Sequence, residues 1–162
     1  MTPVTITLTD DEYQQVVTAA GRRATLHENA GRGNDWTFYR HFLGCASEFA
    51  LAKYVNGSWT PFADEDSFRK IEHDVVGRQG YQVRATDQRF GNLLLTRHDK
   101  PDSVFVLARV KDWPGKRSPI TLVGWITARD GMTADNKAAA HDCPDAEWKV
   151  SADDLNPMET LP

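Results

Sequence analysis

The stretch from Phe38 to Tyr54 constrains the fold most, because its apolar residues continue almost all the way round a helix. At helical spacing Phe42 and Ala46 share one face, while Leu51 lies on the opposite side. A helix of this kind is packed between other elements. Glu48 falls in the middle of the second face, where a carboxylate needs a partner. The stretch predicts a core helix in which Glu48 binds a metal, pairs with a structural arginine or reaches solvent.

The length of 162 residues suits one domain over 1–162, with a core over about 10–130 and a C-terminal tail, 131–162, packed on it. No apolar run approaches the roughly 20 residues that a membrane span needs. The first residues lack a basic stretch followed by an apolar one, so the sequence indicates no secretory signal and a cytoplasmic protein. The net charge of −4 argues against a surface that binds nucleic acid over its whole area, although a local basic groove stays compatible with it.

The N-terminal region predicts a short strand followed by a helix. Val4, Ile6 and Leu8 alternate with threonines, and Thr9 to Glu12 has the form of a capping box. A helix is expected to begin at Asp10 and to stop or weaken at Gly21.

A β-hairpin is predicted in the middle of the chain, from two strand-like runs, Ile71–Val76 and Tyr81–Thr86. Alternation along the second run places Gln82 and Arg84 on one face. Asp74 reaches that same face only if the connection has an odd number of residues.

A three-residue connection over 78–80, with Gly80 in the left-handed conformation, meets this condition. It places Asp74 opposite Arg84 and brings Gln82 within one step. The hairpin then predicts one polar site built from both strands.

Two apolar runs, 104–110 and 120–127, predict further strands of a central sheet, and 93–95 reads as a strand or a helical turn. The expected fold is a mixed α/β domain with a central mixed sheet and flanking helices. A few apolar residues in the last third are expected to hold the tail on the body: Trp148, Val150, Leu155, Met158 and Leu161.

The order of these polar residues resembles a known family. The helix carries Gly44-x-x-x-Glu48-x-Ala50-x-Ala52-Lys53, followed by Asp74 and then by Gln82-Val83-Arg84. This pattern resembles the PD-(D/E)XK, or restriction-endonuclease-like, nuclease superfamily, particularly its small phage- and prophage-encoded members. The likeness covers about residues 10–130 and rests on a short motif.

The resemblance implies a restriction-endonuclease-like core and a Mg²⁺ or Mn²⁺ ion. Asp74 would be the principal metal ligand, and Gln82 would bind through its amide oxygen at the position of the family's glutamate. The carbonyl of Val83 would assist, and Glu48 would be the accessory helical carboxylate. Arg84 would occupy the lysine position. The implied activity is metal-dependent hydrolysis of phosphodiester bonds in nucleic acid, with DNA as the expected substrate, in the cytoplasm of a bacterial host.

The motif departs from the family's pattern at three positions. His73 stands where a proline is often found, Gln82 replaces an acid, and Arg84 replaces lysine. An arginine holds a phosphate in a bidentate fork but cannot serve as a general base. The alternative is a catalytically inactive nuclease-like fold that binds DNA or a protein, in which Glu48, Asp74 and Arg84 form a structural ion-pair network.

A basic loop offers a second candidate contact with nucleic acid. Lys111, Lys116 and Arg117 surround Trp113, which would stack on a base while the cations contact phosphates. The alternative explanation, which the position next to Pro-Gly favours, is that this tryptophan packs on its own sheet. The resemblance also implies that a second copy of the chain, or a phage or host protein, is a partner. No membrane is expected as a partner.

The two cysteines give a weaker indication of zinc. His141 and Cys143 lie close in sequence, but Cys45 is distant and there is no Cys-x-x-Cys pair. A cysteine in an apolar helix is more often a small packing residue than a nucleophile.

Overall fold

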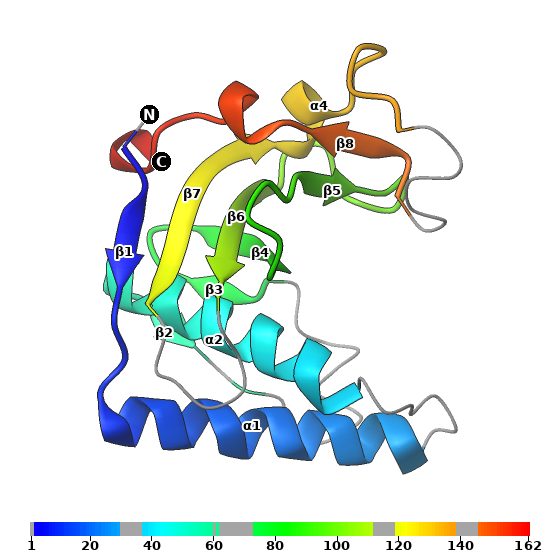
Figure 1. The fold of residues 1–162 in the computed structure, drawn as a ribbon. Helices are drawn as coiled ribbons and strands as arrows, with labels where there is room; N and C mark the ends of the chain where they lie inside the picture. The colour runs from blue at the N-terminus through cyan, green and yellow to red at the C-terminus, as the bar shows by residue number, and fades with distance from the viewer. Residues whose placement is uncertain (1, 30–36, 60, 62–72, 112–118, 139–145) are drawn as a thin grey trace.

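The computed structural model describes residues 2–29, 37–59, 61, 73–111, 119–138 and 146–162. The fold is a mixed α+β structure, as the sequence predicts, built on a six-stranded mixed sheet (Figure 1). In spatial order its strands are β1 (Val4–Ile6), β7 (Ile120–Thr127), β6 (Val104–Val110), β4 (Gly80–Thr86), β3 (Val75–Val76) and β2 (Ser58–Trp59). The helices are α1 (Asp10–Asn29), α2 (Thr37–Val55) and α4 (Ala128–Gly131), with two 3₁₀ turns, η1 (Ala152–Asp154) and η2 (Met158–Thr160). None of the helices within the described ranges is long and apolar enough to cross a membrane.

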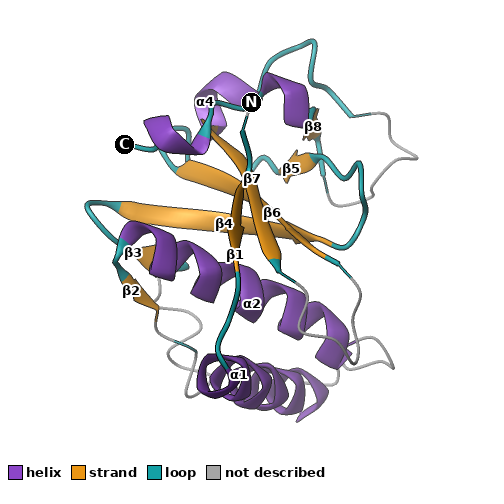
Figure 2. Cartoon of the chain, turned by 60° about the vertical axis from the view of Figure 1, so that its left-hand side comes forward, coloured by secondary structure: helices purple, strands orange, loops and turns teal. Residues whose placement is uncertain are grey.

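Helix α2 lies between α1 and the sheet, which confirms the prediction from its apolar circumference (Figures 1 and 2). Cys45, Ala46, Ala50 and Leu51 are all buried, although they lie on different sides of the helix. Glu48 is buried with them. The helix is covered on both sides because neither face offers enough polar surface to meet water.

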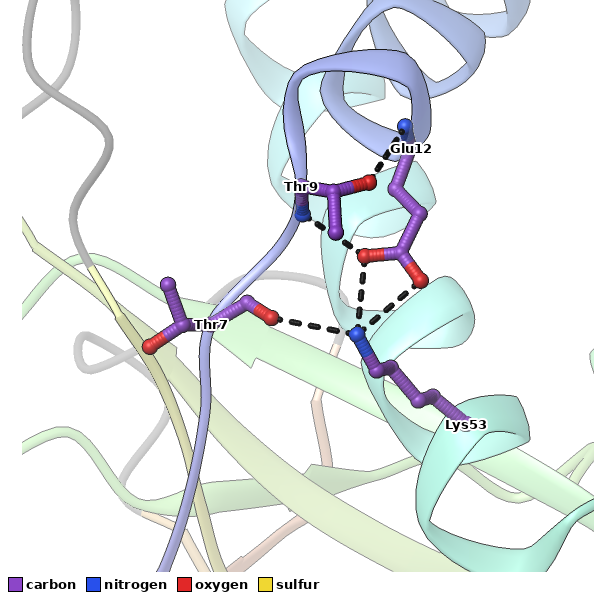
Figure 3. A network of polar contacts seen from close by, with 4 residues as sticks. All are labelled: Thr7, Thr9, Glu12 and Lys53. Carbon is purple, nitrogen blue, oxygen red and sulfur yellow. Dashed lines mark hydrogen bonds and ion pairs between the residues drawn. The ribbon is translucent and has the colours of Figure 1, made fainter.

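Helix α1 begins at Asp10, as predicted, because Thr9 and Glu12 form the expected capping box. The Thr9 N–H donates to Glu12 Oε2 at 2.7 Å, and the Glu12 N–H donates to Thr9 Oγ1 at 3.3 Å. Lys53 of α2 joins this cap: its Nζ donates to Glu12 Oε2 at 2.8 Å and to the Thr7 carbonyl at 3.3 Å (Figure 3). The cap therefore also fixes α1 against α2.

The predicted stop at Gly21 is wrong, because α1 continues to Asn29. The buried face of α1 continues past the glycine, with Ala20 before it and Arg23 and Ala24 after it, all against the interior. One glycine in a helix costs only about 1 kcal/mol relative to alanine, which packing of the next turn offsets.

The hairpin has an odd connection, as predicted, but shifted by one residue. Val75 pairs with Tyr81 and Val76 with Gly80, so the connection is 77–79. Asp74 lies just before β3, and its N–H donates to the Tyr81 carbonyl at 3.0 Å, so Asp74 lies against Tyr81 and not opposite Arg84.

Gly80 has a different role from the predicted one. It is the first residue of β4 and does not adopt a left-handed conformation. A Cβ at this position would lie 2.0 Å from Cγ of His73, so the glycine makes room for the imidazole. Close packing between the two strands, rather than turn geometry, requires a glycine here.

The strands predicted over 104–110 and 120–127 are confirmed as β6 and β7. Strand β6 runs parallel to β4 and antiparallel to β7. Residues 93–95 form β5 (Leu93–Leu95), which pairs with β8 (Trp148–Val150) in a separate two-stranded sheet.

Two apolar cores lie on opposite faces of the main sheet. The first lies between the sheet and the helices α1 and α2, and it includes Tyr81 and Val83 of β4. The second lies towards β5 and β8, and it includes Phe105 and Leu107 of β6. The C-terminal tail contributes to both, since Leu155 is buried in the second core and Met158 in the first. Strand β4 thus lies between the two cores, with one face towards each.

Candidate functional site

Glu48 is held by two partners on the helical side of β4. Arg23 of α1 grips it in a bidentate fork, with Nη1 to Oε1 at 2.8 Å and Nη2 to Oε2 at 2.7 Å. Trp59 of β2 donates its indole N–H to Oε2 at 2.9 Å. Gly44 lies one turn earlier on α2, and a Cβ there would make only an ordinary van der Waals contact with Oε1, at 3.7 Å. Both oxygens of Glu48 are therefore occupied.

Asp74 lies just before β3, at the edge of β4. Its N–H donates to the Tyr81 carbonyl at 3.0 Å, and its Oδ2 accepts from the Val83 N–H at 2.7 Å. Burial, followed by the negative charge of Glu48, raises the pKa of the Asp74 carboxyl to about 6. The Val83 N–H and the positive charges of the neighbouring arginines oppose this shift without cancelling it. The ionised form of the Asp74 carboxyl is therefore less favourable here than it is in water.

The backbone of β4 offers a further oxygen beside Asp74. The N–H and the carbonyl of one strand residue point to the same side. Because the Val83 N–H is directed at Asp74, its carbonyl faces the same edge, away from β6. Gln82 alternates with Val83 along β4 and shares the face of Arg84. The edge thus combines a carboxylate and a backbone carbonyl.

Arg84 lies on the other side of β4, against the second core. Its Nη2 donates to Asp99 Oδ1 at 2.9 Å, and its guanidinium carbon lies 4.8 Å from the centre of the Phe105 ring. Asp99 is itself fixed by the N–H of Thr96, at 2.8 Å from Oδ2. About a third of the Arg84 side chain stays exposed. This guanidinium is oriented on one side and accessible on the other.

The predicted residues therefore come together only in part. Asp74 lies near enough to Glu48 and Arg84 for both charges to affect its pKa. Glu48 faces the helices, whereas Arg84 faces the second core, so the two are separated by β4. No network joins Glu48, Asp74 and Arg84 by ion pairs; each arginine has its own carboxylate partner, Glu48 for Arg23 and Asp99 for Arg84.

The predicted metal ligands differ in whether their oxygen atoms are available to a divalent cation. No group of three or more His, Cys, Asp or Glu side chains that could hold a metal occurs in the described part of the chain. Glu48 does not fit as a ligand, because Arg23 and Trp59 already use both of its oxygens. Asp74, the Val83 carbonyl and the Gln82 amide carry oxygen atoms, the ligand type that Mg²⁺ prefers, and Mg²⁺ keeps several waters when few carboxylates are present.

The predicted basic loop is described only at its start. Lys111 is exposed just after β6, and Trp113, Lys116 and Arg117 lie outside the described residues. The zinc hypothesis is likewise outside them, except for Cys45. That thiol is buried in α2, and burial raises its pKa to about 12, which disfavours the nucleophilic thiolate at neutral pH.

Two residues that define the site were missed by the sequence analysis. Arg23 follows Val16 and Ala20 at helical spacing, so extending the helix past Gly21 would have placed it on the buried face. Asp99 lies in a turn, and its pairing with Arg84 has no signal in the sequence.

Comparison of the chain with models of protein families, with curated proteins and with solved structures finds no match. The fold and the site define a mixed α+β domain with a carboxylate beside a central strand and an arginine–carboxylate pair on each side of that strand.

Proposed function

We propose that this protein is a metal-dependent hydrolase of phosphodiester bonds in nucleic acid, with DNA as the expected substrate. The observation that carries the proposal is Asp74. Its carboxylate lies at the strand edge with a raised pKa and accepts a hydrogen bond from the Val83 N–H. A cation bound there would favour the ionised carboxylate and so oppose the burial and the Glu48 charge that raise the pKa. The resemblance of the motif to PD-(D/E)XK nucleases supports the same reading.

Different residues of the chain would bind the metal and the substrate phosphate. Asp74, Gln82 and the Val83 carbonyl would hold Mg²⁺ or Mn²⁺, which when bound supplies a Lewis acid and an activated water. Arg84 would hold a phosphate oxygen of the substrate, because its guanidinium is oriented by Asp99 and remains accessible. Arg23 pairs with the buried Glu48, so Glu48 would act on Asp74 through its charge and not as a ligand.

The test compares wild type with Asp74→Asn on single-stranded, double-stranded and branched DNA and on RNA. Each substrate is incubated with Mg²⁺ or Mn²⁺, and with EDTA as the metal-free control. We expect metal-dependent cleavage by the wild type and no detectable cleavage by Asp74→Asn, a loss of at least about a hundredfold, since metal assistance is worth several kcal/mol. Asp102→Asn is the matched control, because Asp102 is an exposed aspartate in a loop. Cleavage that persists in Asp74→Asn or in EDTA would contradict the proposal.

A second candidate function is a nuclease-like fold that binds nucleic acid without cutting it. The observation that favours it is the Arg23–Glu48 fork, which removes from the metal the helical carboxylate that the resemblance assigns to it. Under this function no substrate is cut, and Mg²⁺ changes neither the melting temperature nor the titration of Asp74. Metal-dependent cleavage would exclude it.

A further inference from the structure

The segment after β4 presents an aromatic side chain on a fixed turn. The Gly91 N–H donates to the Gln88 carbonyl at 3.1 Å, which closes a tight turn with Arg89 and Phe90 at its corners. The Gln88 N–H donates to Thr86 Oγ1 at 3.1 Å and ties the turn to β4. Phe90 is 79% exposed, and the guanidinium carbon of Arg89 lies 5.1 Å from the centre of its ring. An exposed ring on an ordered turn is available to stack on a planar partner.

A pocket of about 350 Å³ adjoins this turn. Gln88 and Gly91, on either side of the two corner residues, line the pocket, together with Asn92. Arg84 and Lys149 supply positive charge to the same lining, from β4 and β8. The volume lies in the range of small-ligand pockets. Arg84 belongs both to this pocket and to the surroundings of Asp74.

The chemistry of these groups matches a nucleotide. The ring of Phe90 can stack on a base, which every base permits because each has a π-face. The side-chain amides of Gln88 and Asn92 offer both donors and acceptors to a base edge. Arg84, Arg89 and Lys149 can contact phosphates. In a duplex the bases are already stacked and paired, so stacking on Phe90 requires an unpaired base.

We propose that the turn at Phe90 and the adjoining pocket bind an unpaired nucleotide of a single strand, with its base stacked on Phe90 and its phosphate near Arg84 and Lys149. This inference rests on the proposed function in taking nucleic acid as the ligand, and it names the substrate class as single-stranded. The bound single-stranded nucleic acid would then run along β4 from the pocket towards the edge at Asp74.

The experiment measures fluorescence anisotropy of labelled twelve-nucleotide strands of DNA and RNA at low salt. EDTA is present, so that metal-dependent cutting does not interfere. We expect Phe90→Ala to weaken binding about tenfold, within the range measured for loss of one stacked base. Phe90→Trp should retain binding. The matched control is Val76→Ala, because Val76 is the other large apolar side chain found exposed in the described ranges, at 53%.

The Lys149→Met variant tests the phosphate contact. It should weaken binding to all sequences alike and lower the slope of log K against log salt by about one. An unlabelled duplex should compete poorly. The proposal is overturned if Phe90→Ala binds like Val76→Ala, if Phe90→Trp binds as weakly as Phe90→Ala, if the duplex competes as well as the single strand, or if the wild type binds no strand.

The Asp74→Asn variant separates this inference from the proposed function. It should bind single strands like the wild type, since Asp74 does not line the pocket. Binding that depends on Phe90 without any cleavage would leave this inference standing and remove the hydrolase. Metal-dependent cleavage, together with wild-type binding by Phe90→Ala, would remove this inference and leave the hydrolase standing.

Discussion

The two faces of β4 each carry an arginine–carboxylate pair, and the pairs differ in how far they are open to water. On the helical face the side chains of Arg23 and Glu48 are 8% and 9% exposed, and both guanidinium nitrogens of the fork are used. On the other face Arg84 meets Asp99 through one nitrogen and is 33% exposed. The first pair is closed to ligands, whereas the second can exchange a partner. Burial, more than charge, thus separates a structural pair from a binding group.

Replacing Arg23 should have the largest effect on stability. Arg23→Met leaves the Glu48 carboxylate buried without its partner, and breaking such a pair costs about 3–5 kcal/mol. Urea unfolding measures the loss. The matched control is Arg22→Met, because Arg22 is the exposed neighbour on the same helix and should change stability little. Equal losses in the two variants would remove the distinction between the faces.

A double variant sharpens this prediction. Arg23→Met with Glu48→Gln should recover part of the loss, because the buried charge is gone. No recovery would indicate that packing of the arginine stem, and not the ion pair, stabilises the helices.

Asp74 should make stability fall as pH rises. Its pKa is raised from 3.8 in the unfolded chain to about 6 in the folded one, so the folded state binds the proton more tightly. The contribution is full below about pH 4 and is lost as pH rises through about 6. Asp74→Asn removes this dependence and keeps an oxygen for the Val83 N–H, so it should be more stable than wild type at pH 7 by about 1–2 kcal/mol.

The measurement is urea unfolding of both proteins at pH 4 and pH 7. At pH 4 the two should differ little. Mg²⁺ should reduce the difference at pH 7 if the proposed function holds, because a bound cation stabilises the ionised carboxylate. A wild type that gains stability between pH 4 and pH 7 relative to Asp74→Asn would contradict the direction of the pKa shift.

The smallest effect is expected at the open pair. Arg84→Met should cost about 1 kcal/mol or less, and salt should reduce that cost, because partly exposed pairs contribute little. Arg129→Met is the control for a fully open pair, since Arg129 and Asp102 are 68% and 86% exposed. The loss of stability in Arg129→Met should be near zero. A loss at Arg84 as large as at Arg23 would show that the two faces are equally structural.

The sequence predicts most of the fold because its signals are local. The capping box at Thr9 identifies the start of α1, and the apolar circumference of 38–54 identifies a helix inside the core. The alternation of Tyr81 and Val83 with polar residues identifies a half-buried strand. Nothing local predicts that α1 continues past Gly21, because the next turn is stabilised by packing against α2.

The candidate site was predicted less completely, because register and partner choice are not local. The connection of the hairpin is 77–79 and not 78–80, so Asp74 lies against Tyr81 and not opposite Arg84. The close approach of His73 to Gly80 is likewise a contact that no turn rule contains. The pairing of Glu48 is similar: a partner was expected, but Arg23 lies 25 residues away on another helix.

The sequence by itself determined which residues need partners: Glu48 in an apolar helix, and Asp74 and Arg84 beside apolar strands. That need follows from the cost of removing a charge from water, which depends on the residue and its immediate neighbours. Only the tertiary structure decided which partner each one has and how exposed the pair is. Those depend on how α1 packs on α2 and on how β4 lies between two cores, since distance and burial arise from contacts across the whole chain.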